Sequence, residues 1–223
     1  MGIGPYKETR RDEVVAPYER SNHMPQFDLR GIHAAKYVNT DGTISYTGTL
    51  SVGDAMNVNL ELRFAEGRLY AESSLAEYMK KCIGGTISIG VKYIKNAAQQ
   101  LMFGSREKSR SISYTPTGAS ESTTVNVSGL VIGGKTQGKY VGVSFYAPDM
   151  VDGVEKFTCV KIARALFGPP SMQLQTAGET IVFNTPTTSG EFLPDNSSNQ
   201  DLTEVAIVED EEAAIAWCAA VLT

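Results

Sequence analysis

Two segments alternate strictly between polar and apolar side chains, and this alternation limits the fold of the chain more than any other feature. Residues 57–64 read Asn-Val-Asn-Leu-Glu-Leu-Arg-Phe, and residues 86–93 read Thr-Ile-Ser-Ile-Gly-Val-Lys-Tyr. A period of two residues is typical of a β-strand with one buried face and one face in water. We therefore expect two strands whose apolar side chains, Leu62, Phe64 and Tyr93 among them, point inward. The outward-facing set would be Asn57, Asn59, Glu61, Arg63, Thr86, Ser88 and Lys92.

Further β-rich runs fill most of the chain between residues 31 and 193. They lie at 32–38, 43–50, 111–114, 124–128, 139–146, 156–166 and 180–184, and Asn39 to Gly42, Gly133-Gly134 and Asp152-Gly153 supply turn signals between them. Runs of strands without alternating helices favour an antiparallel sheet. The predicted fold is mainly β, an antiparallel β-sandwich or barrel with one flanking helix.

Two segments have helical signals. Ser74-Leu75-Ala76-Glu77 has the spacing of a capping box and is followed by Tyr78, Met79 and Cys82 before Gly84-Gly85, which predicts the core helix. Near the end of the chain, Glu209 to Glu212 precede an Ala-rich run, and acidic residues favour the first turn of a helix. We expect a short terminal helix there.

The ends of the chain differ in composition from the centre. Residues 1–30 mix charges and prolines without periodicity, so we interpret them as an N-terminal arm. The segment 184–203 is rich in Ser, Thr, Asn and Pro, which predicts turns or a linker. The expected organisation is therefore an arm over 1–30, a β domain over 31–193, and a linker with a short helix over 194–223.

Charge and cysteine content exclude several classes of function. Twenty Lys and Arg stand against 25 Asp and Glu, a formal net charge of -5, which is the wrong sign for a protein that grips phosphate backbones. Cys82, Cys159 and Cys218 lie far apart, without a CxxC pair or nearby histidines, so we expect neither paired disulfides nor a zinc site. No run approaches the roughly 20 apolar residues of a membrane helix.

One segment matches a nucleotide-binding motif. Residues 129–136, Gly-Leu-Val-Ile-Gly-Gly-Lys-Thr, satisfy GxxxxGK[ST], the phosphate-cradling loop of nucleotide hydrolases. That loop must open a helix, but residues 137–143 contain two glycines and β-branched residues that resist helix formation. A hairpin turn at Gly133-Gly134 is the preferred interpretation, and a nucleotide hydrolase is kept as an alternative that an ATPase assay would test.

Other residues that could carry chemistry have simpler explanations. His23 and His33 have no Ser or Cys partner with a plausible base relationship, and the acidic pairs and clusters at Asp12-Glu13 and 210–212 fit solvation or a helix N-terminus. We predict no catalytic residue, cofactor site or metal site. A carbohydrate-binding sandwich remains an alternative, although its aromatic platform is missing, because Trp217 is the only tryptophan and lies in the expected terminal helix.

The order of several short motifs resembles the major tail protein, or tail tube protein, of long non-contractile bacteriophage tails. The resemblance covers about residues 31–193. Its motifs are Gly31 to Tyr37, the Asp41-Gly42 turn, Tyr46, Ala55, Leu69 to Glu72, Thr86 to Ile89, Gly138 to Val141, and Thr176 to Thr187.

The resemblance implies a structural virion protein and no enzyme. Subunits of this family close into hexameric rings with a continuous inner β-barrel, and the rings stack into a tube through which DNA passes. It implies the tape-measure, tail terminator and distal tail proteins as partners, and location in the virion tail after synthesis in the host cytoplasm. The inner tube protein of a contractile tail or related injection device is the nearest alternative.

Two sets of residues follow as candidates for assembly. We hypothesise that the outward-facing polar set named above lines the bore of the tube, where water-facing strands are required. The segment 39–55 is the candidate contact between rings, through Asn39, Asp41, Gly42, Tyr46, Gly48, Gly53 and Asp54. We expect it, the arm and a loop over 104–122 to become ordered on polymerisation, which hydrogen exchange would detect.

Overall fold

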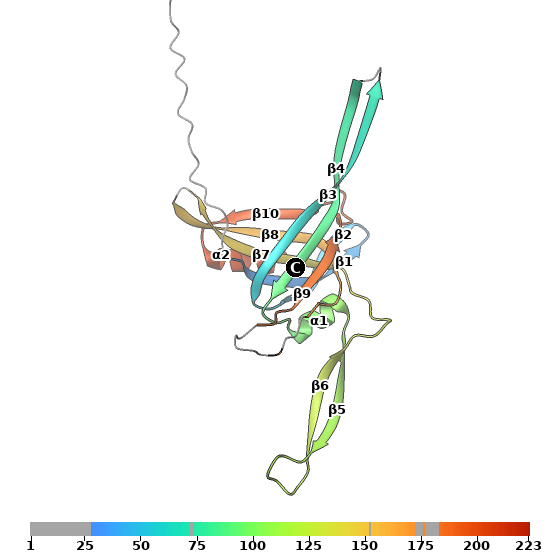
Figure 1. The fold of residues 1–223 in the computed structure, drawn as a ribbon. Helices are drawn as coiled ribbons and strands as arrows, with labels where there is room; N and C mark the ends of the chain where they lie inside the picture. The colour runs from blue at the N-terminus through green and yellow to red at the C-terminus, as the bar shows by residue number, and fades with distance from the viewer. Residues whose placement is uncertain (1–27, 72–73, 152, 173–175, 177–182) are drawn as a thin grey trace, which may run out of the picture.

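The computed structural model describes residues 28–71, 74–151, 153–172, 176 and 183–223. It contains ten β-strands and two α-helices within these ranges (Figure 1). In chain order they are β1 (Arg30–Thr40), β2 (Thr43–Ser51), β3 (Ala55–Ala71), β4 (Ser74–Val91), α1 (Asn96–Phe103), β5 (Arg106–Tyr114), β6 (Thr123–Val131), β7 (Val141–Val151), β8 (Val154–Phe167), β9 (Thr187–Phe192), β10 (Thr203–Val208) and α2 (Glu211–Ala220).

One antiparallel sheet forms the body of the protein. Its strand order is β2-β1-β7-β8-β9-β4-β3, and β10 pairs with the first part of β8 beside this path. The sheet bends at β8, because residues 157–162 of β8 border β10 and residues 165–167 border β9. Strands β9, β4 and β3 thereby lie across β1, β7 and β8 as a second layer (Figure 1). Among the described strands, β2 and β3 end the path without meeting, so the sheet is open and not a closed barrel.

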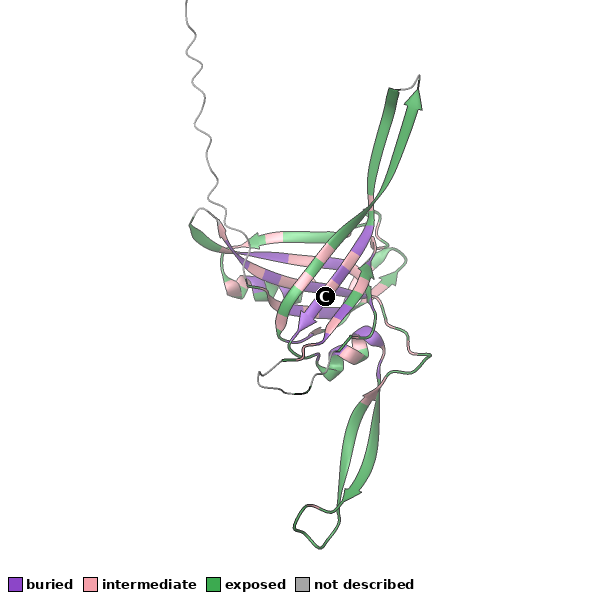
Figure 2. Ribbon diagram, viewed as in Figure 1, coloured by how far each residue is buried: buried purple, intermediate pink, exposed green. Residues whose placement is uncertain are grey.

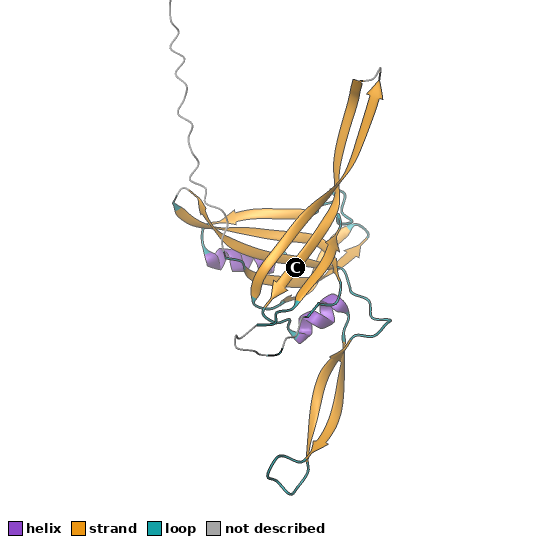
Figure 3. Ribbon diagram, viewed as in Figure 1, coloured by secondary structure: helices purple, strands orange, loops and turns teal. Residues whose placement is uncertain are grey.

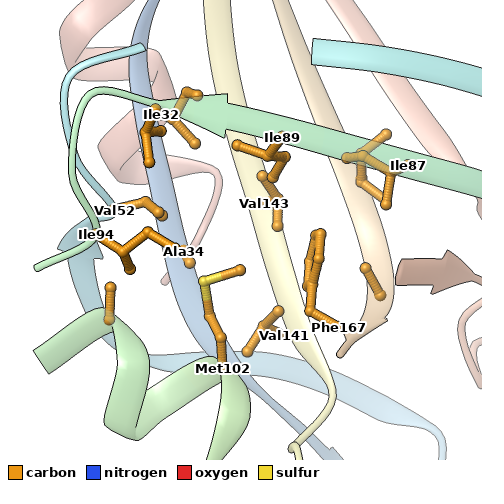
Figure 4. Close-up of a cluster of buried hydrophobic side chains, with 14 of the residues drawn as sticks. Ile32, Ala34, Val52, Ile87, Ile89, Ile94, Met102, Val141, Val143 and Phe167 are labelled. Carbon is orange, nitrogen blue, oxygen red and sulfur yellow. The ribbon is translucent and has the colours of Figure 1, made fainter. Parts of the chain in front are cut away.

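The main core fills the space between the two layers. Ile87 and Ile89 of β4 face Val143 of β7, and helix α1 closes one end with Met102 (Figure 4). All of these side chains are almost fully removed from water. Burial of large aliphatic side chains stabilises a fold by about 1.5–3 kcal/mol each, so this interface is what holds the layers together.

A second, smaller core lies under helix α2 on the other face of β7 and β8. Ala214 and Cys218 of α2 contact Tyr146 and Phe157. Asp210 caps the helix, since its side chain accepts a hydrogen bond from the backbone N–H of Ala213. The acidic first turn predicted from the sequence is confirmed, and so is the short terminal helix.

The mainly β, antiparallel fold expected from the sequence is confirmed, and most of the expected strands are present. The turn at Asp41-Gly42 is also present: both residues have positive φ angles and join β1 to β2, as a two-residue hairpin requires. The run predicted over 180–184 lies largely outside the described residues. So does the arm predicted over 1–30, of which residues 28–30 are described and Arg30 already belongs to β1.

The predicted core helix at Ser74 is wrong. This segment is the first part of β4 and pairs along its length with β3, from Ala71 with Ser74 to Phe64 with Cys82, with one register shift between Leu69 and Tyr70 (Figure 3). The pairing with a long partner strand outweighs a local capping signal. Helix α1, which the sequence analysis did not predict, lies at 96–103 instead.

Three segments expected to be irregular contain strands. The stretch 184–203 holds β9, which is paired with both β4 and β8, and the C-terminal 30 residues hold β10 besides α2. The expected loop over 104–122 begins with strand β5 (Arg106–Tyr114), of which only residues 111–114 were predicted as β-rich. Polar residues hid β5 and β9, because these strands have at least one face in water, whereas β10 is a short, mostly apolar run next to a polar stretch.

Candidate assembly surfaces

Six of the seven residues in the outward-facing polar set come together on one face of β3 and β4. Asn59 lies directly opposite Ser88, and Glu61 lies opposite Thr86. Directly opposed residues of antiparallel strands point to the same side. Asn57 and Arg63 continue this row at its two ends. The sequence pattern therefore identified a real polar ribbon.

Lys92 lies just beyond that ribbon. Strand β4 ends at Val91, and the backbone N–H of Lys92 donates to the carbonyl of Asp54 over 2.9 Å. Its ammonium is 4.0 Å from the Asp54 carboxylate. Tyr93, predicted to be inward, is 46% exposed for the same reason.

Strand β9 extends the polar ribbon in a way that the sequence did not reveal. Ser189 lies opposite Ser88, and Glu191 lies opposite Thr86. The Ser189 hydroxyl donates to that of Ser88 over 3.4 Å, and Arg63 pairs with Glu191 over 3.2 Å. The ribbon is thus three strands wide, hydroxyl-rich and mixed in charge.

The free edge of the ribbon is strand β3. It has 17 residues and, among the described strands, pairs only with β4. Beside it lies a cavity of about 580 Å³ between the two layers, lined by apolar side chains of β3 such as Val58 and Leu60, and by Phe145 and Val160 from β7 and β8. A long unpaired edge next to apolar surface is a template for pairing with another chain.

The far halves of β3 and β4 form an arm that leaves the body (Figures 1 and 2). Every described residue from Glu61 to Lys81 is exposed. Leu62 and Phe64, predicted to be buried, are 47% and 45% exposed because β3 has already passed the core. The arm is stabilised locally by Lys80, which lies 4.4 Å from the centre of the Phe64 ring and 3.2 Å from a Glu66 oxygen; this pairing lowers the pKa of Glu66.

Strands β5 and β6 form a second arm on the opposite side of the body (Figure 1). One face is a ladder of small polar side chains: Ser109 bonds to Ser128 over 2.9 Å, and Ser113 bonds to Thr124 over 2.7 Å. The other face, which we call the cationic face, alternates with it. Its members are Arg106, Lys108, Arg110, Ile112 and Tyr114 of β5, opposite Val131, Gly129, Val127, Val125 and Thr123 of β6.

The cationic face was missed in the sequence, although basic residues at positions 106, 108 and 110 already have the period of a strand.

Both arms lack the packing that would make a two-stranded ribbon stable. A two-stranded ribbon is marginally stable in water by itself, and neither arm buries its side chains against the body.

The candidate contact segment 39–55 is mostly strand and not loop. Strand β2 occupies 43–51 at the other end of the sheet path, and Tyr46 within it is buried. The Tyr46 hydroxyl donates to the carbonyl of Ala163 over 2.9 Å. Asn39, Asp41, Gly42 and Gly48 lie exposed at the rim, whereas Gly53 is buried against the backbone of Tyr93, and Asp54 is exposed.

The other sequence candidates do not form a site among the described residues. The GxxxxGK[ST] segment runs from β6 into a turn at 133–136, where Thr136 N–H donates to the carbonyl of Gly133, and no helix follows it before β7. His33 Nδ1 lies 2.8 Å from the carbonyl of Gly31. Trp217 is partly buried against the core under α2, so it offers no exposed platform. His23, Asp12 and Glu13 lie outside the described residues.

The described part of the chain holds no group of three or more His, Cys, Asp or Glu side chains placed to bind a metal ion. Its three cysteines are free thiols. Burial raises the pKa of Cys159, and it raises the pKa of Cys218 to about 12. None of the described helices is long and apolar enough to cross a membrane.

Comparison with known proteins leaves the family open. No protein-family model matches this sequence, and none of the curated proteins is similar enough to it to count as a match. The function must therefore be argued from the surfaces described above.

Proposed function

We propose that this protein is a structural subunit that polymerises, as stacked hexameric rings, into the tube of a long non-contractile bacteriophage tail. In this proposal the polar ribbon of β3, β4 and β9 faces the bore, DNA passes without specific binding, and the tape-measure, tail terminator and distal tail proteins are the partners. The resemblance described from the sequence motifs suggests this class, and three features of the surface support it.

The free edge of β3 carries the proposal. Natural proteins protect exposed edges with bulges, charges, prolines or covering elements. The strand carries charged side chains and its pairing with β4 has register shifts, but residues 55–71 contain no proline, no described strand pairs with this edge, and it runs well past the core. Pairing of β3 with the other free edge, β2, of an identical subunit would satisfy both edges and, repeated around a ring, would leave neither free.

The polar ribbon supports the bore assignment. Its hydroxyl, amide and mixed charged groups can stay hydrated, and the chain as a whole is acidic, so DNA would pass without being held. The two arms support stacking, because each is a ribbon without a core of its own that another subunit could cover.

A pair of proline variants tests the edge directly. In an antiparallel strand, the backbone N–H groups of consecutive residues point to opposite sides. Of Glu61→Pro and Leu62→Pro, one therefore breaks the ladder with β4 and the other removes a donor only from the free edge. Thermal unfolding identifies the second variant, whose melting temperature stays close to that of the unchanged protein.

That folded variant should form neither rings nor tubes in negative-stain microscopy and should remain a monomer in light scattering. Glu61→Ala and Leu62→Ala are the matched controls, since they keep both N–H groups, and they should assemble normally. Rings of unchanged diameter from the folded proline variant would exclude pairing through this edge.

A further inference from the structure

Among the described residues, no salt bridge involves the basic side chains on the cationic face of the β5–β6 arm. The face carries three basic residues, at 106, 108 and 110, and none of the positions directly opposed on this face is acidic. The face has a depression of about 190 Å³, lined by Lys108, Val127 and Gly129 among others. Exposed Ile112 and Tyr114 extend the same face with apolar surface.

The C-terminal part of the chain has the opposite charge. Residues 194–223 contain seven acidic side chains and no Lys, Arg or His. Among the described residues, only Glu204 and Glu211 of these seven have a basic partner within 4.0 Å, Lys161 and Arg30 respectively. The remaining acids leave this part of the surface strongly negative.

A concave recess lies within this acidic part. It has a volume of about 190 Å³ and is lined by three acidic residues, Asp195, Asp201 and Glu204, together with Thr203, Ala163 and Lys161, whose ammonium lies 3.4 Å from Glu204. The wall is fixed, since Asp195 Oδ1 accepts hydrogen bonds from the backbone N–H groups of Ser197 and Asp201. We call this the acidic recess.

The carboxylates of the acidic recess help to raise the pKa of a neighbouring tyrosine. Burial raises the pKa of Tyr46, and the charges of Asp195, Glu204 and Asp201 raise it further. These carboxylates do not form a metal cluster. The end of a Lys or Arg side chain occupies far less than 190 Å³, given that a water molecule occupies about 30 Å³ of liquid, so such a side chain can enter.

The two surfaces cannot meet within one subunit. Strand β10, which begins at the acidic recess, lies on the side of the body away from the β5–β6 arm (Figure 1). The arm is about 30 Å long, from nine residues at 3.3 Å each, and points away from the body. A contact between unlike surfaces of identical copies is heterologous, and repetition of such a contact produces an open filament.

We infer that the cationic face of the β5–β6 arm of one copy docks at the acidic recess of a second copy, and that this contact joins subunits along the filament. The inference rests on the proposed function, because it assigns the residues by which neighbouring rings would be held. Charge complementarity makes a second copy the favoured partner; nucleic acid is the competing partner for basic side chains.

Two charge-reversal variants test the contact. Variant A is Lys108→Glu with Arg110→Glu, and variant B is Asp201→Lys with Glu204→Lys. Each should raise the protein concentration needed for filament formation about tenfold or more, because several opposed charges become like charges. Lys135→Glu with Lys139→Glu changes the net charge as much as variant A, at exposed positions off the cationic face, and should assemble normally.

A mixture of variants A and B gives the sharpest readout. The reversed arm of A fits the reversed recess of B, and the unchanged arm of B fits the unchanged recess of A. The mixture should therefore assemble at close to the normal concentration, whereas either variant alone should not. Variants that simply misfold would not rescue each other, so recovery in the mixture cannot be an effect of folding.

Cross-linking separates this inference from the proposed function. A carbodiimide should join Lys108 to Asp201 or Glu204, and mixing isotope-labelled with unlabelled protein should show that the link is between copies. This link in a protein that never forms rings would support the contact and overturn the proposed function. Normal tubes from variant A, or tubes of the unchanged protein that lack the link, would overturn the contact alone. So would a variant A that loses binding to a duplex DNA probe while its assembly is unchanged.

Discussion

The joint between the two layers gives the prediction with the best-defined magnitude. Phe192 of β9 is fully buried and lies opposite Gly85 of β4 on one side and Ala165 of β8 on the other. Its ring therefore packs between the two layers at the point where the sheet bends. Phe192→Ala should lower the free energy of unfolding by about 3–5 kcal/mol, the cost of removing a fully buried aromatic ring.

The same change at Phe183 is the matched control, because that side chain is 86% exposed. Phe183→Ala should change the free energy of unfolding by less than about 0.5 kcal/mol. Urea unfolding at low protein concentration measures both. With a slope of about 2–3 kcal/mol per molar urea, Phe192→Ala should move the midpoint down by roughly 1.5 M without changing the slope.

A third variant examines the same contact from the other side. A Cβ at Gly85 would overlap the Phe192 ring and the carbonyl of Glu61, so Gly85→Ala should cost about 1–3 kcal/mol or more. Combined with Phe192→Ala, the cost should be less than the sum of the two, because one of the two obstacles is gone. Equal losses in Phe192→Ala and Phe183→Ala, or full additivity in the double variant, would refute this account of the joint.

Two further predictions concern helix α2. The carboxylate of Glu211 accepts hydrogen bonds from Arg30 over 2.7 Å and from Tyr146 over 3.0 Å, which lowers its pKa below the usual 4.5. The stabilisation that ionised Glu211 provides through these hydrogen bonds is fully present above about pH 4.5. It is lost as the pH falls through the lowered pKa of Glu211. The stability advantage over Glu211→Gln should therefore shrink below about pH 4.5 in urea titrations. Asp210→Ala should cost about 1 kcal/mol, because the N–H of Ala213 loses its cap; an unchanged unfolding midpoint would show that the cap is replaced.

The alternation rule correctly predicted the strands that carry the polar ribbon but not how far their inward faces would be covered. Val58 and Leu60 contact the core, whereas Leu62 and Phe64 continue the same pattern into the exposed arm. Alternation describes two faces of a strand and says nothing about whether a second layer reaches either of them. The coverage depends on where β7 and β8 end, which is a tertiary property.

The error at Ser74 has a similar origin. The spacing of Ser74 and Glu77 fits a capping box, but alternation resumes along the same segment, with Tyr78 and Lys80 on one face and Met79 on the other. Pairing with β3 decides between the two patterns. The missed helix α1 had a usable signal, since residues 97–102 are strong helix formers and Gly104 ends the helix in the left-handed region.

The polar ribbon was half predicted, because its β3 and β4 members lie in strongly alternating sequence and its β9 members do not. Ser189 and Glu191 lie in a short strand of six residues within a Ser- and Thr-rich stretch. Only the long-range pairing of β9 with β4 brings them to the ribbon. Nothing local in the sequence specifies a partner about 100 residues away.

The two arms leave the body in opposite directions and carry different chemistry, one aromatic with balanced charges and the other cationic. A row of such subunits, all oriented alike, has a top that differs from its bottom. Growth from each end then presents a different surface to incoming copies. An initiating complex that fits only one of these ends would start every polymer in the same sense, and a different cap would be needed to stop it.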